Sequence, residues 1–143
     1  MEANYHLLSK KAAWGDQGDG TYVNPVLPGD YSDPDVIRVG DDYYAISSTL
    51  HCSPGMAVLH SKDLVNWRMI GHVVNDLTNI GPEYNYDRMN RYGRGVWAGA
   101  IRFHKGRYWV YFFTPDEGLF MNGGRPSWAL GAAASGLGGQ RLG

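Results

Sequence analysis

The chain has 143 residues, of which 43% are hydrophobic and 13% aromatic, a composition typical of a globular protein with a core and unlike that of a disordered segment. Its formal net charge is −1, with no long run of one sign, which gives no electrostatic support for a nucleic-acid or membrane partner. The single cysteine, Cys52, excludes an internal disulfide and a cysteine-rich metal site.

The amino-terminal twenty residues contain no apolar run long enough for a signal peptide, and no stretch of the chain approaches the length of a membrane span. We therefore expect a cytoplasmic protein. The five histidines are scattered without metal-ligand spacing. For this reason we expect neither a metal site nor a cofactor.

From residue 35 onward the chain has the pattern of short β-strands separated by turns. Runs rich in β-branched and aromatic residues predict four strands, at 35–39, 43–48, 56–61 and 67–73. Glycine, proline and aspartate residues lie between the runs and favour tight connections. We therefore expect one antiparallel sheet of four strands.

A second set of strands is predicted at 95–103, 107–113 and 118–121, after a polar, tyrosine-rich stretch that we interpret as a long loop. The two sets are related to each other. VIRVGDDYYAISST, starting at Val36, can be aligned with AIRFHKGRYWVYFFT, starting at Ala100, if one residue is inserted. In this alignment Ile37 corresponds to Ile101, a spacing of 64 residues (101 minus 37).

A repeat of this length, with about four strands in each unit, is typical of a β-propeller blade, and propellers close with about four to eight blades. The chain is therefore long enough for about two blades, and we expect a fragment of a longer ring. Chance similarity between two amphipathic hairpins is the alternative, because strand patterns are common.

The last 22 residues differ in character from the rest: residues 122–143 contain no acidic side chain, are rich in glycine and alanine, and show no strand alternation. A frameshift or a truncated gene would produce such a change, and a natural flexible linker is the alternative. We therefore divide the chain into an amino-terminal extension (1–23), two blades (24–121) and a tail (122–143).

An aspartate, Asp33, stands where a turn-rich loop becomes the first predicted strand, in the run NPVLPGDYSDPDVIRVGDDYY from Asn24 to Tyr44. A carboxylate at the mouth of a strand can point into a cleft. The structural alternative is a simple turn, because a residue before proline is extended and an aspartate there readily binds nearby backbone amides.

This run resembles the opening of glycoside hydrolase family 43, the β-xylosidase and α-L-arabinofuranosidase group. The resemblance rests on Asn24-Pro25, Pro28-Gly29, Tyr31, the Asp33-Pro34-Asp35 core and the segment HSKDLVNW from His60 to Trp67, which stand in the family's order and spacing. It implies an all-β fold, a partial five-bladed β-propeller in which this chain forms about two blades of four-stranded antiparallel sheets. It also implies that Asp33, in the family's (S/P)DP(S/D) motif, is the general base of an inverting glycoside hydrolysis.

The resemblance implies further site residues. Asp116, in the segment FTPDEG, corresponds to the aspartate that tunes the pKa of the general acid. Other family members carry this aspartate in a WAPD-like motif, but this chain has Gly99 and Ala100 at the last two positions of that motif. A Pro-Asp turn is the structural alternative for Asp116. His51 falls where the family lines its sugar subsite, and Trp97 is a candidate for stacking on a sugar face, with core packing as the alternative.

The family's general acid is a glutamate on a later blade, and none of Glu2, Glu83 and Glu117 is expected to replace it. We therefore expect a chain that is inactive, or nearly so, by itself. The leading hypothesis is a glycosidase that releases xylose or arabinose from plant polysaccharide fragments, and its substrate is then its one expected partner. The alternatives are a non-catalytic carbohydrate-binding propeller, in which Asp33 and Asp116 bind sugar hydroxyls, and a misread gene fragment without a settled function.

Overall fold

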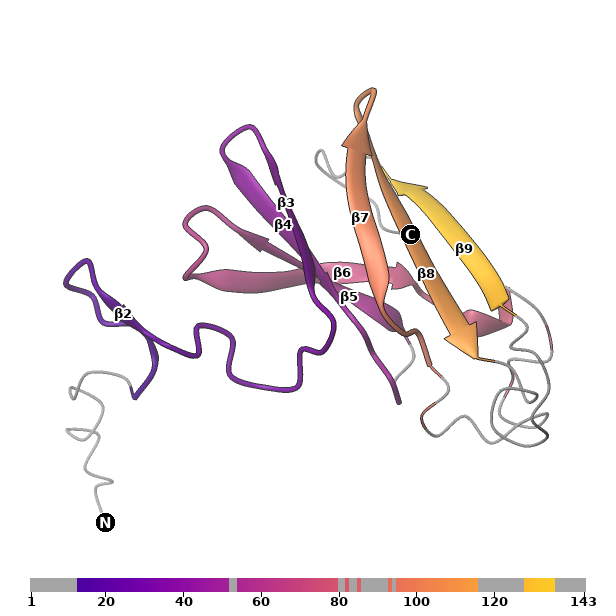
Figure 1. Cartoon of the computed structure of the whole chain (residues 1–143), viewed down its shortest axis with the longest axis horizontal. Helices are drawn as coiled ribbons and strands as arrows, with labels where there is room; N and C mark the ends of the chain where they lie inside the picture. The colour runs from indigo at the N-terminus through magenta and orange to yellow at the C-terminus, as the bar shows by residue number, and fades with distance from the viewer. Residues whose placement is uncertain are drawn as a thin grey trace, which may run out of the picture.

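The computed structural model describes residues 13–51, 54–79, 82, 85, 93, 95–115 and 128–135, with the side chains of 113, 115 and 128–135 left aside. Within these residues the fold consists of β-strands and one short 3₁₀ turn, Leu77–Asn79 (η2). Two larger sheets lie next to each other, and a small amino-terminal hairpin projects to one side (Figure 1). No helix in the described part of the chain is long and apolar enough to span a membrane.

The first large sheet is the predicted four-stranded antiparallel sheet. Its strands follow in the order β3 (Asp35–Val39), β4 (Asp42–Ser47), β5 (Gly55–Ser61) and β6 (Trp67–Val74). Each strand pairs with the next one along the chain, because the connections, residues 40–41, 48–54 and 62–66, are short. The predicted bounds agree with the observed strands to within one residue at every end.

The second large sheet contains β7 (Gly99–His104), β8 (Arg107–Pro115) and β9 (Trp128–Ser135), again in sequence order and antiparallel. β7 and β8 confirm two of the predicted strands, although β7 begins at Gly99 and the prediction began at residue 95. The predicted strand at 118–121 lies outside the described residues. The aligned isoleucines occupy equivalent places, since Ile37 is the third residue of β3 and Ile101 is the third residue of β7.

The tail, residues 122–143, shows no strand alternation, yet it contributes the strand β9. Its sequence, WALGAAAS, lacks alternation and β-branched residues, so its own preference for a strand is weak. The strand forms because the edge of β8 offers an open row of backbone groups, and β9 pairs with it from Tyr108↔Ser135 to Pro115↔Trp128. A neighbouring edge thus determines a strand that its own sequence does not predict.

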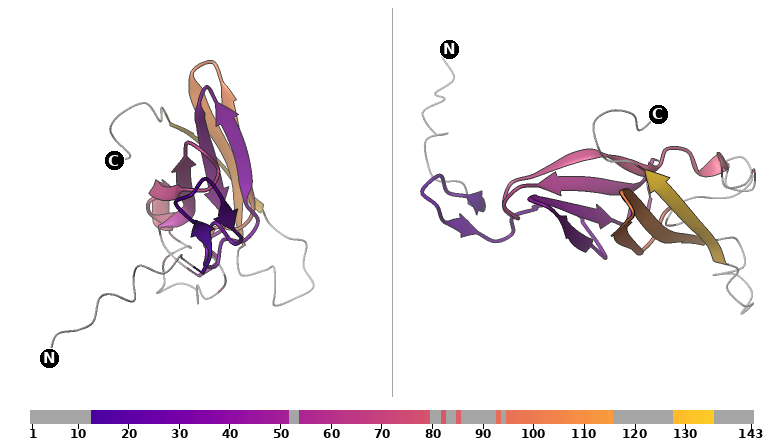
Figure 2. Two further views of the ribbon diagram at one scale, coloured as in Figure 1. Left: turned by 90° about the vertical axis from the view of Figure 1, so that its left-hand side faces the viewer. Right: turned by 90° about the horizontal axis from the view of Figure 1, so that it is seen from above.

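The core lies between the two large sheets, because buried hydrophobic residues of both form one cluster. Two further views show the sheets next to each other (Figure 2). The first strands of the sheets, β3 and β7, are in contact, as expected for successive blades of a propeller. Gly99 leaves room for the packing between the sheets, because a Cβ atom there would lie 2.9 Å from the methyl carbon of Met56 on β5 and 2.7 Å from the carbonyl oxygen of Tyr111 on the neighbouring strand β8. The buried hydrophobic side chains include Ile46, Met56, Val58, Val96, Ile101, Val110 and Phe112.

The amino-terminal hairpin consists of β1 (Gly15–Asp16) and β2 (Tyr22–Val23). No strand was predicted in this extension. The hairpin touches the first blade through Asn66, whose side-chain amide donates a hydrogen bond to Asp16 at 3.0 Å.

Candidate active site

One end of the two sheets carries most of the predicted site residues. Because the strands are antiparallel, β3 and β7 begin at the end where β4 and β8 finish. Asp33 lies just before β3, and His51 lies in the connection between β4 and β5. Trp97 precedes β7. We call this the Asp33 end of the blades.

Asp33 is an exposed residue whose backbone is in the left-handed region, with φ of 49°. Aspartate tolerates this region better than most residues, although glycine is favoured there. The Ser48 hydroxyl donates a hydrogen bond to Asp33 Oδ2 at 3.1 Å. Next to it, the Ser32 carbonyl accepts hydrogen bonds from the Ser48 amide at 3.1 Å and from the Ser47 hydroxyl at 3.0 Å. The loop before β3 is therefore fastened to the last residues of β4.

Asp35, two residues further along the same motif, connects the two blades. Its Oδ2 atom accepts a hydrogen bond from the Ile101 backbone amide at 2.8 Å and forms an ion pair with Arg102 Nη1 at 2.6 Å. Both partners lie on β7, the first strand of the second blade. The carboxylate thus satisfies a buried backbone donor and fixes the loop that carries Asp33 against the second blade.

Further contacts join the blades at the same end. Thr49 and Val96 form an isolated antiparallel bridge, with the Thr49 amide donating to the Val96 carbonyl at 2.9 Å. The Gly95 amide donates to the Leu50 carbonyl, also at 2.9 Å. A Cβ atom on Gly95 would lie 2.3 Å from the Thr49 carbonyl oxygen, so this contact requires glycine.

His51 and Trp97 both form hydrogen bonds with the backbone of Gly93. The Gly93 amide donates to His51 Nδ1 at 2.9 Å, and the Trp97 indole N–H donates to the Gly93 carbonyl at 2.9 Å. Because Nδ1 accepts a hydrogen bond, a neutral His51 ring carries its hydrogen on Nε2. His51 is exposed and Trp97 is partly buried. The two residues therefore belong to one hydrogen-bonded unit that spans the junction between the blades.

The sequence of the chain matches a known family. The sequence model described as glycosyl hydrolases family 43 matches residues 22–134. The chain belongs to this family. The family match extends beyond Met121 into the tail, residues 122–143.

Individual family 43 relatives agree with this assignment. The chain is 51% identical over 113 residues to a β-xylosidase of Formosa agariphila, which covers 79% of this chain and 19% of the relative. It is 41% identical over 105 residues to a non-reducing end α-L-arabinofuranosidase of Bacteroides ovatus, which covers 70% of this chain and 19% of the relative. The crystal structure of a xylan β-1,4-xylosidase from Bacillus halodurans is 29% identical, with a TM-score of 0.64, over 78% of this chain and 20% of that one.

These findings confirm the predicted family and the predicted fold class, an all-β partial five-bladed propeller. The chain spans about a fifth of the length of the relatives that it matches. Asp33, His51 and Trp97 lie at one end of the described blades. Asp116, the predicted modulator of the acid, lies outside the described residues, and so does Cys52.

Sequence reasoning missed two residues at this end of the family 43 chain. Ser48 was predicted only as the last residue of a strand, and nothing in its neighbourhood indicates a contact with Asp33. Asp35 belongs to the motif, but its partners lie 66 and 67 positions further along the chain. The alignment of Ile37 with Ile101 was the one signal that could have brought β3 and β7 together.

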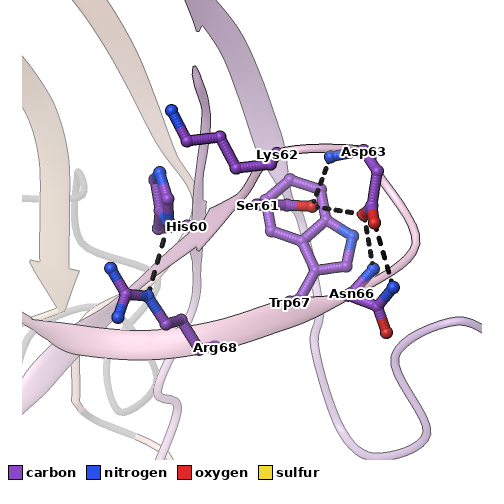
Figure 3. A pocket seen from close by; sticks show the side chains of 7 residues that line it. All are labelled: His60, Ser61, Lys62, Asp63, Asn66, Trp67 and Arg68. Carbon is purple, nitrogen blue, oxygen red and sulfur yellow. Dashed lines mark hydrogen bonds between the residues drawn. The ribbon is translucent and has the colours of Figure 1, made fainter. Parts of the chain in front are cut away.

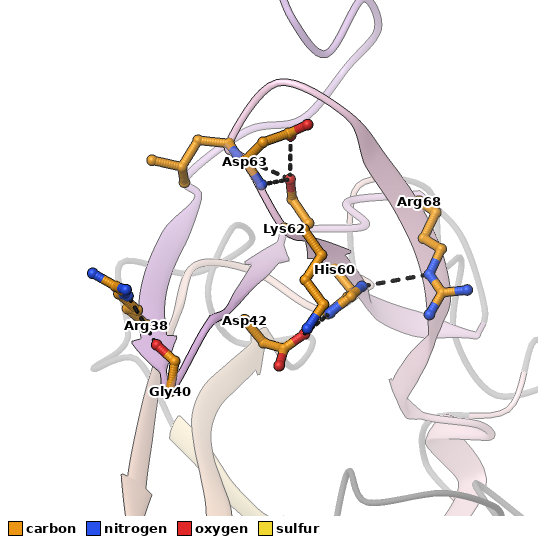
Figure 4. A network of polar contacts seen from close by, with 9 residues as sticks. Arg38, Gly40, Asp42, His60, Lys62, Asp63 and Arg68 are labelled. Atoms are coloured by element: carbon orange, nitrogen blue, oxygen red, sulfur yellow. Dashed lines mark hydrogen bonds and ion pairs between the residues drawn. The ribbon is translucent and has the colours of Figure 1, made fainter.

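The opposite end of the first blade carries a polar network (Figure 4). His60 Nε2 lies 2.5 Å from Asp42 Oδ1, Lys62 Nζ lies 2.7 Å from the same oxygen, and Arg68 donates to His60 Nδ1 at 3.4 Å. The pKa of Asp42 is lowered most by the hydrogen bond from Lys62 and next by the one from His60. The hydrogen bond between Lys62 and Asp42 also raises the pKa of Lys62.

A surface pocket of about 410 Å³ lies next to this network, in the turn between β5 and β6 (Figure 3). It is lined by residues 60–63 and 66–68. Asp63 receives hydrogen bonds from the side chain and amide of Asn66 and from the Val65 amide, which together hold its pKa well below the usual range. The Trp67 indole donates to the Leu64 carbonyl. These hydrogen bonds lie within the turn between β5 and β6 and stabilise it. Among the described residues, no group of three His, Cys, Asp or Glu side chains could hold a metal ion.

Proposed function

We propose that this chain is part of an inverting glycosidase and that Asp33 is its general base. The observation that supports this role most directly is the placement of Asp33, an exposed carboxylate just before the start of β3 with one oxygen bound by Ser48. The membership in family 43 supports the type of reaction. The proposed activity is that of a complete propeller ring, of which this chain provides two blades.

In the proposed reaction, water attacks the anomeric carbon on the face opposite the leaving sugar while the bond to the leaving oxygen breaks. Asp33 takes a proton from that water, and a carboxylic acid gives a proton to the leaving oxygen. The two carboxyl groups must lie about 6.5–9.5 Å apart to admit the water. All three glutamates of this chain lie outside the described residues, and we propose that the acid is a glutamate from a later blade.

We propose that the substrate is a xylose- or arabinose-containing fragment of a plant polysaccharide, because the relatives are named as a β-xylosidase and an α-L-arabinofuranosidase. Neutral sugars are recognised by aromatic faces and hydrogen-bonding side chains. Trp97 and His51 would line the sugar site, since both lie at the Asp33 end and are bound to the same backbone unit. Asp116 would tune the acid.

The test uses a complete-ring protein, which we define as a protein that carries this sequence in its first two blades and has the remaining blades present. Its hydrolysis of aryl β-xylosides and aryl α-arabinofuranosides is measured beside two variants, Asp33→Asn and Asp30→Asn. Loss of a general base lowers kcat by about 10²- to 10⁴-fold. Asp30 is an exposed aspartate of the same loop, so Asp30→Asn should retain the activity of the unchanged protein. Equal activity of all three proteins would refute the assignment, and sugar binding without hydrolysis would favour the non-catalytic alternative.

A further inference from the structure

Ser48 is a buried serine, 6% exposed, which directly follows β4. It contacts the Asp33 loop twice. Its amide donates to the Ser32 carbonyl at 3.1 Å, and its hydroxyl donates to Asp33 Oδ2, also at 3.1 Å. The backbone and the side chain of one residue thus fix the peptide before Asp33 and the carboxylate of Asp33.

The hydroxyl contact leaves the two oxygens of Asp33 unequal. A carboxylate is an acceptor at both oxygens, and the hydrogen bond from Ser48 occupies a lone pair of Oδ2. Oδ2 keeps a second lone pair, so Oδ1 is the less engaged of the two acceptors for the proton of an attacking water. We propose that Ser48 is a positioning residue that holds Asp33 so that Oδ1 faces the water, an inference that rests on the proposed role of Asp33 as the base.

Asp33 needs such a contact because little else among the described residues holds its side chain. The residue is exposed, and its backbone is in a region that aspartate occupies less readily than glycine. An exposed side chain without a fixed partner moves among its staggered rotamers. A base that is displaced by about 1 Å can lose about 100-fold in rate. The Ser48 hydroxyl projects from the rigid end of a strand and can restrict this motion.

Ser47 makes a useful comparison at the same strand end. Its hydroxyl donates to the Ser32 carbonyl and therefore holds the backbone of the loop, whereas Ser48 alone of these two donates to the carboxylate. The position of the loop and the orientation of the base are thus secured by different hydroxyls.

The test begins with Ser48→Ala, Ser48→Cys and Ser48→Thr in the complete-ring protein. Removal of a hydrogen bond to a charged group should lower kcat by about 10- to 100-fold, with a smaller change in KM. Ser48→Cys retains the size of the side chain but has a weak donor, so it should lose a similar factor. Ser48→Thr retains the hydroxyl and should recover most of the rate. The matched control is Ser61→Ala, because Ser61 is a buried serine of the same sheet at its opposite end. This control should lower the melting temperature and leave kcat within about twofold.

A second experiment separates positioning from general support of the fold. Asp33→Gly opens space for azide, which can attack the anomeric carbon in place of the activated water. If Ser48 acts through the carboxylate, Ser48→Ala lowers the rate of the protein that has Asp33 but changes the azide-dependent rate of Asp33→Gly by less than about twofold. An equal loss in both backgrounds would overturn the proposal.

The remaining outcomes are also decisive. Unchanged kcat in Ser48→Ala and Ser48→Cys would refute the proposal while leaving Asp33 as the base. Full activity of Asp33→Gly without azide would instead refute the proposed function itself. If Ser48→Ala does not fold, as judged by its melting curve, Ser48→Cys is used in both backgrounds and decides by the same criterion.

Discussion

Replacement of Asp35 should loosen the junction between the two blades, and the size of the effect follows from its two partners. Ile101 is 1% exposed, and its amide donates to Asp35 Oδ2. Asp35→Ala leaves this buried donor without its acceptor, which costs about 1–3 kcal/mol. The ion pair contributes less, because the Arg102 and Asp35 side chains are 60% and 30% exposed, and such pairs contribute about 0–1 kcal/mol.

Two further variants separate these contributions. Asp35→Asn retains an oxygen that can accept from the Ile101 amide. Arg102→Met removes the ion pair and the hydrogen bond from Arg102 Nη1 to the Ile101 carbonyl but leaves the Ile101 amide its acceptor, so each variant should cost about 1 kcal/mol or less. Hydrogen exchange of the peptide that contains residues 99–104 measures the local opening in the complete-ring protein. Since 1.4 kcal/mol corresponds to tenfold, Asp35→Ala should speed exchange by roughly 5- to 150-fold and the other two variants by less than about tenfold.

Equal exchange rates in Arg102→Met and Asp35→Ala would contradict this prediction, because the ion pair and not the buried amide would then dominate. Unchanged exchange in Asp35→Ala would contradict it as well.

Three other predictions concern the blades and their turns. Gly95→Ala should destabilise the protein by about 1–3 kcal/mol in urea unfolding, because the new Cβ atom would meet the Thr49 carbonyl oxygen. Gly106→Ala should cost only about 1 kcal/mol, because Gly106 has a φ of +75° but open space around it. A larger cost for Gly106→Ala than for Gly95→Ala would contradict the close contact at Gly95. The lowered pKa of Asp63 stabilises the fold above the pKa of about 3.9 in the unfolded chain, and this stability is lost as the pH falls through the lower pKa of the folded state. The melting temperature of wild type should therefore fall more steeply below pH 4 than that of Asp63→Asn, and parallel curves would disagree with this. The 143-residue chain expressed alone should be poorly soluble or loosely packed, because the described sheets end in edge strands, among them β6 and β9, that pair with no further strand there. A sharp cooperative melt of a soluble monomer would count against this.

The sequence predicted the first blade well because its signals are local. Strand runs rich in β-branched and aromatic residues are bounded by turns such as Gly40-Asp41 and the Asp63 turn, and each strand pairs with the next. The place of Asp33 could also be predicted, because turn residues end where β3 begins. These features require knowledge of only a few neighbouring residues.

The remaining features depend on contacts between distant residues. β9 forms against the edge of β8, although its own residues do not favour a strand. The contact between Ser48 and Asp33 spans 15 positions, and the contact between Asp35 and Ile101 spans 66. Neither serine nor aspartate carries a pattern that reveals its partner at such a separation, so the structure was needed to find both.

The configuration of the product formed by Asp33→Gly with azide tests the role of Asp33 most directly. If Asp33 is the base of an inverting reaction, the variant is nearly inactive in water, and azide restores turnover of an aryl glycoside in the complete-ring protein. Nuclear magnetic resonance should then identify a glycosyl azide whose anomeric configuration is opposite to that of the substrate. A glycosyl azide of retained configuration, or a variant that needs no azide, would contradict the account.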